Sequence, residues 1–208
     1  PHEELIEKAV GRKQISIGIP HDFQDGEKRI ALTPEAVKIL TDTGNEVFME
    51  RGAGADAGFT DMEYSDNGAV VADTAEIVYN CDIIIKIAPF TSKEASLLRG
   101  GQIIISFMNA ATMGDDTLSV MMRKRVTALA SEIIKDSDGM FPVVESMSEI
   151  SGITSVLLAS EYLSTTSGGK GVMLGGVTGV TPTEVIIVGA NTAGEYAARA
   201  ALGLGAIV

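Results

Sequence analysis

The sequence has no tryptophan, one cysteine, two histidines, and only 16 basic residues against 28 acidic ones. The single cysteine, Cys81, excludes an internal disulfide and suits the reducing cytoplasm, where disulfides are rare. The formal net charge of −12 argues against a nucleic-acid or anionic-membrane partner, because both would repel an acidic surface. We therefore expect a cytoplasmic protein with no nucleic-acid partner and no membrane contact of its own.

Long apolar runs and metal-ligand clusters are also missing. No run approaches the ~18 residues of a membrane span. The acids Glu132, Glu145 and Glu149 are scattered, with no partner at metal-ligand spacing, so we predict no metal site. With 45% hydrophobic but only 5% aromatic residues, the core must consist of aliphatic side chains and methionine. A chain of 208 residues is long enough for one large domain, or for one domain and part of a second.

Short apolar runs alternate with helical segments over the first two thirds of the chain. We predict strands at residues 14–20, 46–50, 69–72, 82–87, 102–107 and 126–130. We predict helices at residues 34–43, 61–67, 75–79, 93–98 and 115–124. Strands that are apolar throughout, such as three isoleucines at 83–85, are typical of a parallel sheet covered on both faces. The pattern predicts an α/β fold with an open, mostly parallel sheet, of the Rossmann or flavodoxin-like kind.

The last third of the sequence has a different organisation. A polar turn at 136–142 suggests a domain boundary, which divides the chain into a substrate-side α/β domain, 1–142, and a second part, 143–208. Residues 148–164 are expected to form one long helix, with Ser148 a candidate N-cap. A glycine-rich loop at 168–180 then leads to an apolar segment that begins at Val185.

The segment from Val185 onward resembles the start of a dinucleotide-binding domain, with a strand, a tight turn and a helix. Gly189 and Gly194 match the first and last glycines of the Gly-x-Gly-x-x-Gly motif, in which the helix N-terminus holds a pyrophosphate. Asn191 replaces the middle glycine, and asparagine tolerates unusual backbone angles better than most residues. The predicted cofactor-binding residues of this turn are Gly189, Ala190, Asn191, Thr192, Ala193 and Gly194.

This motif leaves two matters open. Strand–glycine–helix units also occur in doubly wound domains that bind no dinucleotide. The acid that binds the cofactor ribose is expected about 20 residues beyond the turn, at or just past Val208, so NADP is not excluded as an alternative to NAD. We expect residues 1–208 to be a truncated part of a nicotinamide-dependent enzyme that has little activity alone.

Six phrases support a more specific comparison. They are residues 17–20 (Ile-Gly-Ile-Pro), 27–34 (Glu-Lys-Arg-Ile-Ala-Leu-Thr-Pro), 52–54 (Gly-Ala-Gly), 85–87 (Ile-Lys-Ile), 147–149 (Met-Ser-Glu) and 168–177 (Gly-Gly-Lys-Gly-Val-Met-Leu-Gly-Gly-Val). In this order and spacing the chain closely resembles the alanine dehydrogenase and nicotinamide nucleotide transhydrogenase α-subunit family. The resemblance implies a substrate domain and a Rossmann domain around one active site, NAD as cofactor, a small carboxylate or amino-acid substrate, and a homo-oligomer.

Arg29 and Lys86 are the candidate substrate-binding residues. A guanidinium can hold a carboxylate through two parallel hydrogen bonds, although Arg29 taken alone could equally be a surface residue of a polar loop. Lys86 ends an apolar run, where an unpaired ammonium would be costly, so it either points into a ligand cleft or extends to water. The resemblance favours function for both, because the family has a substrate arginine and a substrate lysine in these phrases.

Asn109 stands where the resemblance places a proton-transferring histidine of alanine dehydrogenases. Asparagine cannot titrate and can only orient a substrate by hydrogen bonding, which leaves its catalytic role in doubt. Met147 and Ser148 match family positions near the nicotinamide. Three functions therefore stay open: an alanine dehydrogenase that interconverts L-alanine and pyruvate, a transhydrogenase α subunit that works with a membrane subunit, and a non-catalytic homologue that has lost the histidine.

Overall fold

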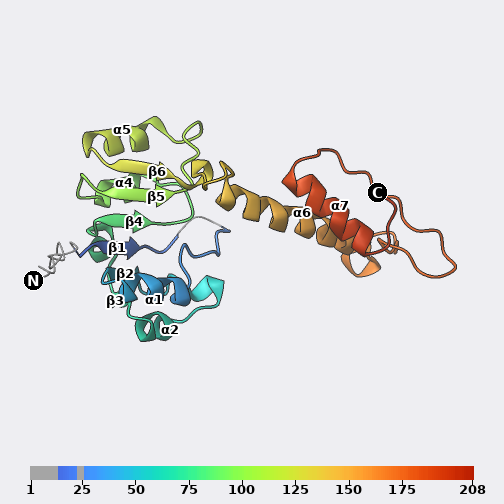
Figure 1. The fold of residues 1–208 in the computed structure, drawn as a ribbon, viewed down its shortest axis with the longest axis horizontal. Coiled ribbons are helices and arrows are strands. Elements are labelled where there is room, and N and C mark those ends of the chain that lie inside the picture. Colours follow the sequence, from blue (N-terminus) through green and yellow to red (C-terminus); the bar gives the residue numbers. More distant parts are fainter. Residues whose placement is uncertain (1–13, 23–25) are drawn as a thin grey trace, which may run out of the picture. The chain divides into compact units, whose positions relative to one another are not determined.

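The computed structural model describes residues 14–22 and 26–208, and the chain divides into two compact units (Figure 1). The first unit ends at Ser131, and the second comprises Glu132–Val208. This division falls before the long helix of the second unit, whereas the domain boundary expected from the sequence falls at its first residue, Pro142. The assignment of domains 1–142 and 143–208 stays a prediction.

The first unit contains every strand and helix expected between residues 14 and 130. Its strands are β1 (Ser16–Ile19), β2 (Glu46–Glu50), β3 (Val70–Ala72), β4 (Ile83–Ile85), β5 (Ile103–Ser106) and β6 (Thr127–Ala130). Its helices are α1 (Pro34–Asp42), α2 (Asp61–Asp66), α3 (Ala75–Tyr79), α4 (Ser92–Leu97) and α5 (Asp115–Arg123), with a short 3-10 turn, η1 (Ala55–Ala57), before α2. A second 3-10 turn, η2 (Ser131–Ile133), follows β6.

The six strands form one open sheet in the order β3-β2-β1-β4-β5-β6, and all pairs are parallel. This is the strand order of a doubly wound nucleotide-binding fold, so the predicted fold class is confirmed. The order reverses between β1 and β4, which pair through Ile17 and Ile83. In open sheets of this kind, ligands bind at the carboxyl ends of the strands that flank such a reversal.

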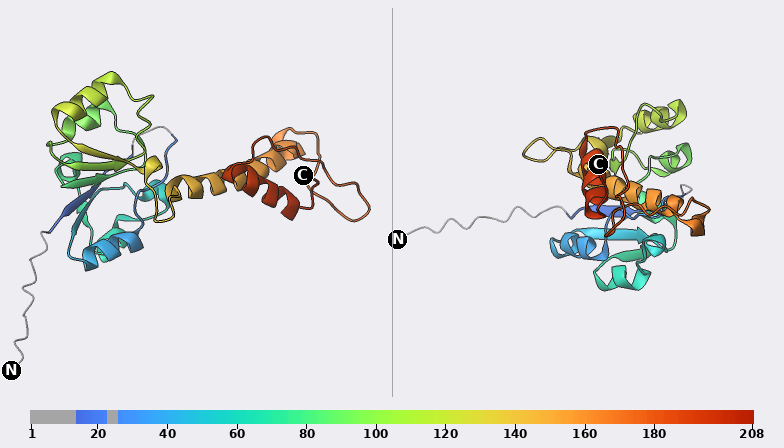
Figure 2. Two further views of the ribbon diagram at one scale, coloured as in Figure 1. Left: turned by 45° about the horizontal axis from the view of Figure 1, so that its top comes forward. Right: turned by 90° about the vertical axis from the view of Figure 1, so that its right-hand side faces the viewer.

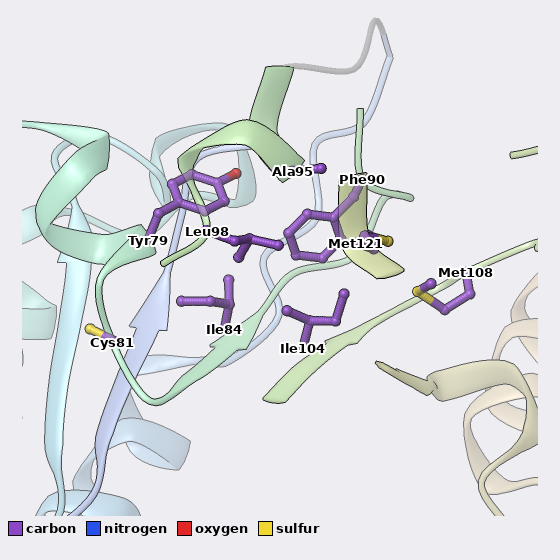
Figure 3. Packing of buried hydrophobic residues seen from close by; sticks show 9 residues of the cluster. All are labelled: Tyr79, Cys81, Ile84, Phe90, Ala95, Leu98, Ile104, Met108 and Met121. Carbon is purple, nitrogen blue, oxygen red and sulfur yellow. The ribbon is translucent and has the colours of Figure 1, made fainter. Parts of the chain in front are cut away.

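Helices cover both faces of this sheet (Figure 2), and each face has its own core. Because side chains alternate along a strand, Ile17 and Ile19 of β1 point to the face covered by α1 and α2. On the opposite face, Ile84 and Ile104 pack beneath α3, α4 and α5, together with Tyr79 and the other residues drawn in Figure 3. The apolar character of the central strands β1, β4 and β5, whose polar residues stand only at strand ends, follows from this two-sided burial.

Three helices of the first unit, α1, α2 and α4, begin at threonine side-chain caps. Thr33 precedes α1, and its side chain accepts the N–H of Ala36. Thr60 and Thr91 each form a capping box with the glutamate three residues later, which satisfies helix-terminal N–H groups that would otherwise lack partners.

The second unit contains α6 (Pro142–Leu163), the 3-10 turn η3 (Thr165–Ser167) and α7 (Thr192–Gly203). The helix expected at 148–164 starts earlier, with proline in its first turn, so the interpretation of Ser148 as an N-cap is wrong. The apolar segment from Val185 forms no ladder. Only one parallel bridge, between Glu184 and Ile207, is present there, because a regular strand needs a neighbour that pairs with it over several residues.

Small residues let α6 and α7 pack closely. Gly152 of α6 lies so near α7 that a Cβ there would clash with the carbonyl oxygen of Ala193 and stand 3.0 Å from the nitrogen of Ala197. Val156 of α6 is buried against Ala197 and Ala201 of α7 in the core of this unit. Among the described residues, no helix is long and apolar enough to cross a membrane.

Gly18 of β1 provides the first test of this packing. A Cβ at position 18 would clash with the carbonyl oxygen of Val78 in α3 and lie 3.1 Å from Cδ1 of Ile84. We expect Gly18→Ala to lower the free energy of unfolding by about 1–3 kcal/mol, the usual cost of overpacking a core. Urea denaturation followed by circular dichroism measures this change.

Gly114 is the matched control, because it belongs to the same unit and an added Cβ would meet nothing within 4 Å. Gly114 is the N-cap of α5, so Gly114→Ala should lower the free energy of unfolding by no more than about 0.5–1 kcal/mol, the cost of alanine at a helix N-cap. Equal effects of the two substitutions would show that α3 does not need the glycine in order to approach β1.

Candidate functional site

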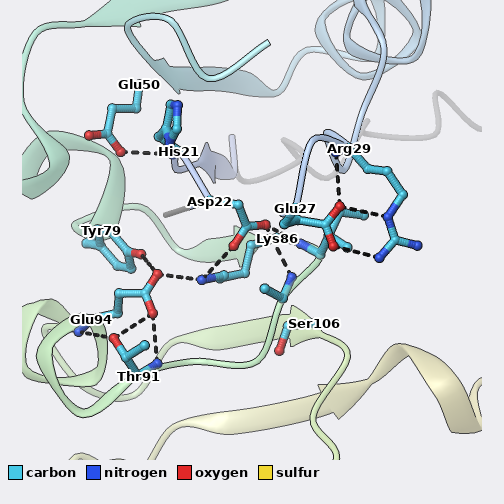
Figure 4. A network of polar contacts seen from close by, with 12 residues as sticks. His21, Asp22, Glu27, Arg29, Glu50, Tyr79, Lys86, Thr91, Glu94 and Ser106 are labelled. Carbon is cyan, nitrogen blue, oxygen red and sulfur yellow. Dashed lines mark hydrogen bonds and ion pairs between the residues drawn. The ribbon is translucent and has the colours of Figure 1, made fainter. Parts of the chain in front are cut away.

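Ionisable side chains gather where the strand order reverses, at the carboxyl ends of β1 and β4 (Figure 4). Asp22 lies three residues after the end of β1, and Lys86 directly follows β4. The two residues are far apart in sequence, yet Lys86 Nζ forms an ion pair with Asp22 Oδ1 at 2.9 Å. The site therefore occupies the position at which open parallel sheets bind ligands.

Lys86 is almost completely enclosed, with a side chain only 2% exposed. Besides Asp22, its ammonium forms an ion pair with Oε1 of Glu94 and lies 5.3 Å from the centre of the Phe90 ring. The sequence indicated that an unpaired ammonium would be costly at this position. It did not identify the two carboxylates, Asp22 and Glu94, that pair with it. An ammonium has three N–H donors, so two ion pairs leave one donor for another acceptor.

Glu94 uses its two carboxylate oxygens for different purposes. Oε1 accepts from the Tyr79 hydroxyl at 3.0 Å and from Lys86. Oε2 accepts from the backbone N–H and the hydroxyl of Thr91, both at 2.7 Å, and so caps α4. Burial would raise the pKa of Glu94, but the Lys86 charge and the Thr91 hydrogen bonds outweigh it and hold the pKa below its usual value.

The residues around this ion pair are themselves fixed. Oδ2 of Asp22 accepts the backbone N–H groups of Ile87 at 3.0 Å and Ala88 at 3.2 Å, which ties the end of β1 to the chain after β4. Burial, and then the nearby charge of Glu94, raises the pKa of the Tyr79 hydroxyl, so Tyr79 remains a neutral hydrogen-bond donor.

Arg29 is a second cation in this region, and its partner is a separate carboxylate, Glu27. Its side chain is 55% exposed and forms a two-pronged contact with Glu27, from Nε to Oε1 at 2.8 Å and from Nη2 to Oε2 at 2.6 Å. The hydrogen bond to Glu27 raises the pKa of Arg29, and the charges of Glu27 and Asp22 act in the same direction. Figure 4 shows Arg29 paired with Glu27, and Lys86 paired with Asp22 and Glu94, in the same region at the ends of the strands.

A cavity of about 960 Å³ opens beside Lys86 within the first unit. Lys86, Glu94 and Tyr79 line it, together with apolar side chains of Phe90 and Met108. A largely apolar cavity with a few polar groups directed into it is the usual form of a small-molecule site.

Asn109 follows β5 and lies outside the residues that line this cavity. Its backbone has a φ of +39°, in the left-handed region that asparagine adopts more readily than most residues. Its carbonyl oxygen accepts the N–H of Thr112 at 2.9 Å, so the residue closes a turn. The structure therefore places Arg29 and Lys86 in one region, each paired with its own carboxylates, and places Asn109 in the loop between Met108 and Thr112, which line the cavity.

The glycine motif of the second unit forms the expected turn before α7. Gly189 has a φ of +120°, and a Cβ at Gly194 would clash with the carbonyl oxygen of Gly189. Asn191 has a φ of −86° and is the N-cap of α7. The tolerance of asparagine for unusual backbone angles is therefore not used here, because any residue can adopt these angles. Met147 and Ser148 lie in α6, several residues beyond its start.

Sequence reasoning missed Asp22, Glu94 and Tyr79. One signal was available, since Thr91-x-x-Glu94 matches the capping-box pattern before a helix. That pattern identifies Glu94 as a helix cap, but it cannot show that the other carboxylate oxygen binds Lys86.

The strand order, the ionic site at its reversal and the following glycine turn define a doubly wound α/β protein of the nucleotide-binding class. The chain belongs to the alanine dehydrogenase/PNT family. The family's N-terminal domain matches residues 18–151, and its C-terminal domain matches residues 155–208.

Relatives and solved structures agree with this assignment. The chain is 38% identical over 193 residues to an alanine dehydrogenase of Methanococcus maripaludis, and this match covers 92% of the chain and 52% of that protein. It is 36% identical to an alanine dehydrogenase of Geobacillus stearothermophilus over 93% of the chain and 52% of that protein. An L-alanine dehydrogenase structure superposes with a TM-score of 0.87 at 34% identity, over 92% of this chain and 53% of the other.

A transhydrogenase structure from Sinorhizobium meliloti superposes with a TM-score of 0.80 at 26% identity, over 92% of this chain and 57% of the other. The chain spans about half the length of the curated relatives it matches. Its membership of the family is supported by sequence identity to the curated relatives and by superposition on the solved structures.

Replacing Lys86 tests the ion-pair cluster. In Lys86→Met, Asp22 and Glu94 remain buried without a cation, which should lower the free energy of unfolding at pH 7 by about 3–5 kcal/mol. In the parent chain the depressed pKa of Glu94 stabilises the fold above the unfolded value of about 4.3, and this contribution is lost as the pH falls through the folded pKa. In the variant the pKa of Glu94 should instead rise, so acidification favours folding.

The stability deficit of Lys86→Met should therefore shrink as the pH falls from 7 to 4, as measured by urea denaturation at each pH. Lys93→Met is the control, because Lys93 is exposed on α4 and its replacement should have little effect at any pH. A deficit that does not change with pH would contradict this account of Glu94.

Proposed function

We propose that the complete protein is an NAD-dependent oxidoreductase of the alanine dehydrogenase type, which interconverts L-alanine and pyruvate in the cytoplasm. The observation that carries this proposal is the position of Arg29 and Lys86 together near the carboxyl ends of the strands where the strand order reverses (Figure 4). Two cations at a ligand-binding sheet edge suit a small acid with a second polar group. The dehydrogenase relatives support the same reaction class.

In this proposal Arg29 binds the substrate carboxylate. Its two-pronged contact with Glu27 already has the geometry that a guanidinium adopts with any carboxylate. The substrate carboxylate would replace that of Glu27, since both need the same two donors. The exposed position of Arg29 makes this exchange accessible from solvent.

Lys86 would hold the 2-oxo or 2-amino group through its remaining N–H donor. Asp22 and Glu94 fix the ammonium from two sides, so the third donor has a defined direction. A positioned cation of this kind polarises a carbonyl group and favours attack at its carbon.

The cofactor would be held by the turn from Gly189 to Gly194, with Met147 and Ser148 near the nicotinamide. The close approach of Gly194 to Gly189 fits the tight turn that a pyrophosphate requires. When bound, the nicotinamide accepts or returns the hydride of the substrate carbon. NAD is the proposed cofactor, and NADP is the alternative.

A transhydrogenase α subunit is the second candidate, and Asn109 is the observation that favours it. Amino-acid oxidation needs a group that accepts protons. The asparagine side chain does not titrate, so it cannot be that group. Direct hydride transfer between two nicotinamides needs no such group. The S. meliloti transhydrogenase structure supports this alternative at the level of the fold.

Arg29→Ala in the complete protein tests the substrate site. We expect kcat/KM with L-alanine to fall by the equivalent of about 2–4 kcal/mol, because a charge-assisted carboxylate contact is lost. Steady-state kinetics measure this effect. Arg51→Ala is the control, since Arg51 is similarly exposed and pairs with Asp73. If both variants lose activity equally, Arg29 has no special role.

Asn109→His separates the two candidate functions. For an alanine dehydrogenase, the added histidine should raise turnover with L-alanine by roughly 10²-fold, because a positioned base becomes available. For a transhydrogenase, alanine oxidation should stay absent and hydride transfer between nucleotides should not improve. Efficient alanine oxidation by the unmodified protein, with no group near neutrality in its pH profile, would show that the histidine is dispensable.

A further inference from the structure

The cavity of the first unit is much larger than alanine requires. Its volume of about 960 Å³ lies near the upper end of the range of about 300–1,000 Å³ that holds drug-sized molecules. Alanine and pyruvate carry only a methyl group on the carbon that the reaction changes. When that carbon lies at Lys86, which lines the cavity, a methyl group leaves most of the space unused.

The inner wall of this cavity is apolar. Tyr79 of α3, Phe90 after β4 and Met108 after β5 line the cavity, and all three are buried. Leu97 of α4 and Met113 before α5 also line it, and methionine side chains adapt readily to the shape of a neighbour. A hydrocarbon group that covers this wall is stabilised in proportion to the apolar area removed from water.

The charges around the cavity disfavour a carboxylate inside it. The Lys86 ammonium already faces two carboxylates, those of Asp22 and Glu94. Besides burial, the charges of Glu94, Glu50 and Asp22 raise the pKa of the Tyr79 hydroxyl, so the wall at Tyr79 has a negative potential. An anion would be repelled there, whereas a neutral carbonyl oxygen can accept the remaining N–H of Lys86.

The groups of a 2-oxo acid therefore divide between two places. Arg29 is exposed and does not line the cavity, so it can take the carboxylate outside, as in the proposed function. Lys86 takes the neutral 2-oxo group at the cavity wall. The side chain on the same carbon is the one group left, and the space beside Lys86 that can receive it is apolar.

We propose that this cavity binds a large apolar side chain of the substrate, so that the protein acts on 2-amino and 2-oxo acids with an aliphatic or aromatic side chain. This inference rests on the proposed function, and the reaction is the same. The amino acid, water and NAD⁺ give the 2-oxo acid, ammonium, NADH and a proton. A hydrocarbon side chain covers Tyr79, Phe90 and Met108, whereas a side chain that ends in a carboxylate is repelled.

Binding of three 2-oxo acids to the complete protein tests the inference, by calorimetry in the presence of NADH and without ammonium. 4-Methyl-2-oxopentanoate should bind at least about tenfold more tightly than pyruvate, because its longer hydrocarbon chain is buried. 2-Oxoglutarate has a chain of similar length that ends in a carboxylate, and it should bind no more tightly than pyruvate. In the reverse direction, kcat/KM for L-leucine should exceed that for L-alanine.

Two variants that reduce the cavity show where the side chain lies. Ala75 and Gly114 both line the cavity, and a Cβ at Gly114 meets nothing within 4 Å, so Gly114→Leu should fold even where Ala75→Leu does not. Each variant should bind 4-methyl-2-oxopentanoate at least about tenfold more weakly and pyruvate with unchanged affinity. Ala36→Leu is the control, because Ala36 is half-buried in the first turn of α1, as Ala75 is in α3, but does not line the cavity.

The outcomes distinguish this inference from the proposed function. If the parent protein binds pyruvate as tightly as 4-methyl-2-oxopentanoate, this inference alone is overturned and the reaction with alanine stands. An advantage of the longer acid that survives in both cavity variants also overturns it, because the side chain then lies elsewhere. If no 2-oxo acid binds to the parent protein, both the inference and the proposed function are overturned.

Discussion

The buried ammonium of Lys86 imposes the strongest constraint on the first unit. A cation removed from water costs several kcal/mol unless charged partners and hydrogen bonds surround it. Those partners come from the end of β1 through Asp22 and from the start of α4 through Glu94, with Tyr79 of α3 bonded to the same glutamate. The partners that neutralise Lys86 therefore fix the ends of β1 and β4 and the helices α3 and α4. These elements surround the carboxyl ends of the strands, where the sheet is expected to bind its ligand.

The sequence predicted the sheet well, because its information is local. Three consecutive isoleucines in β4 indicated a strand buried on both faces. The ion pair between Asp22 and Lys86 could not be predicted in the same way, since it depends on how β1 and β4 pair across more than sixty residues. The sequence identified Lys86 as unusual and left its partners unknown.

The second unit was harder to predict, for two physical reasons. The long helix was expected to begin at residue 148, whereas proline in its first turn marks the start of α6 at Pro142. At position 191, the departure from glycine was attributed to backbone conformation, but the backbone is ordinary there and the side chain makes the difference. In both cases the sequence drew attention to the residue but did not show its role at the helix start, because hydrogen-bond partners depend on the fold.

The divided role of the Glu94 carboxylate gives the first unit a mechanical property. One oxygen accepts hydrogen bonds from Thr91 at the start of α4, and the other accepts from Lys86 and Tyr79. The carboxylate therefore links the start of the helix to the end of β4. A molecule that binds Lys86 restrains the ammonium, and through the shared carboxylate it also restrains the helix start. Occupancy of the cavity should therefore slow amide hydrogen exchange in α4, which lines the cavity and is also held by the shared carboxylate.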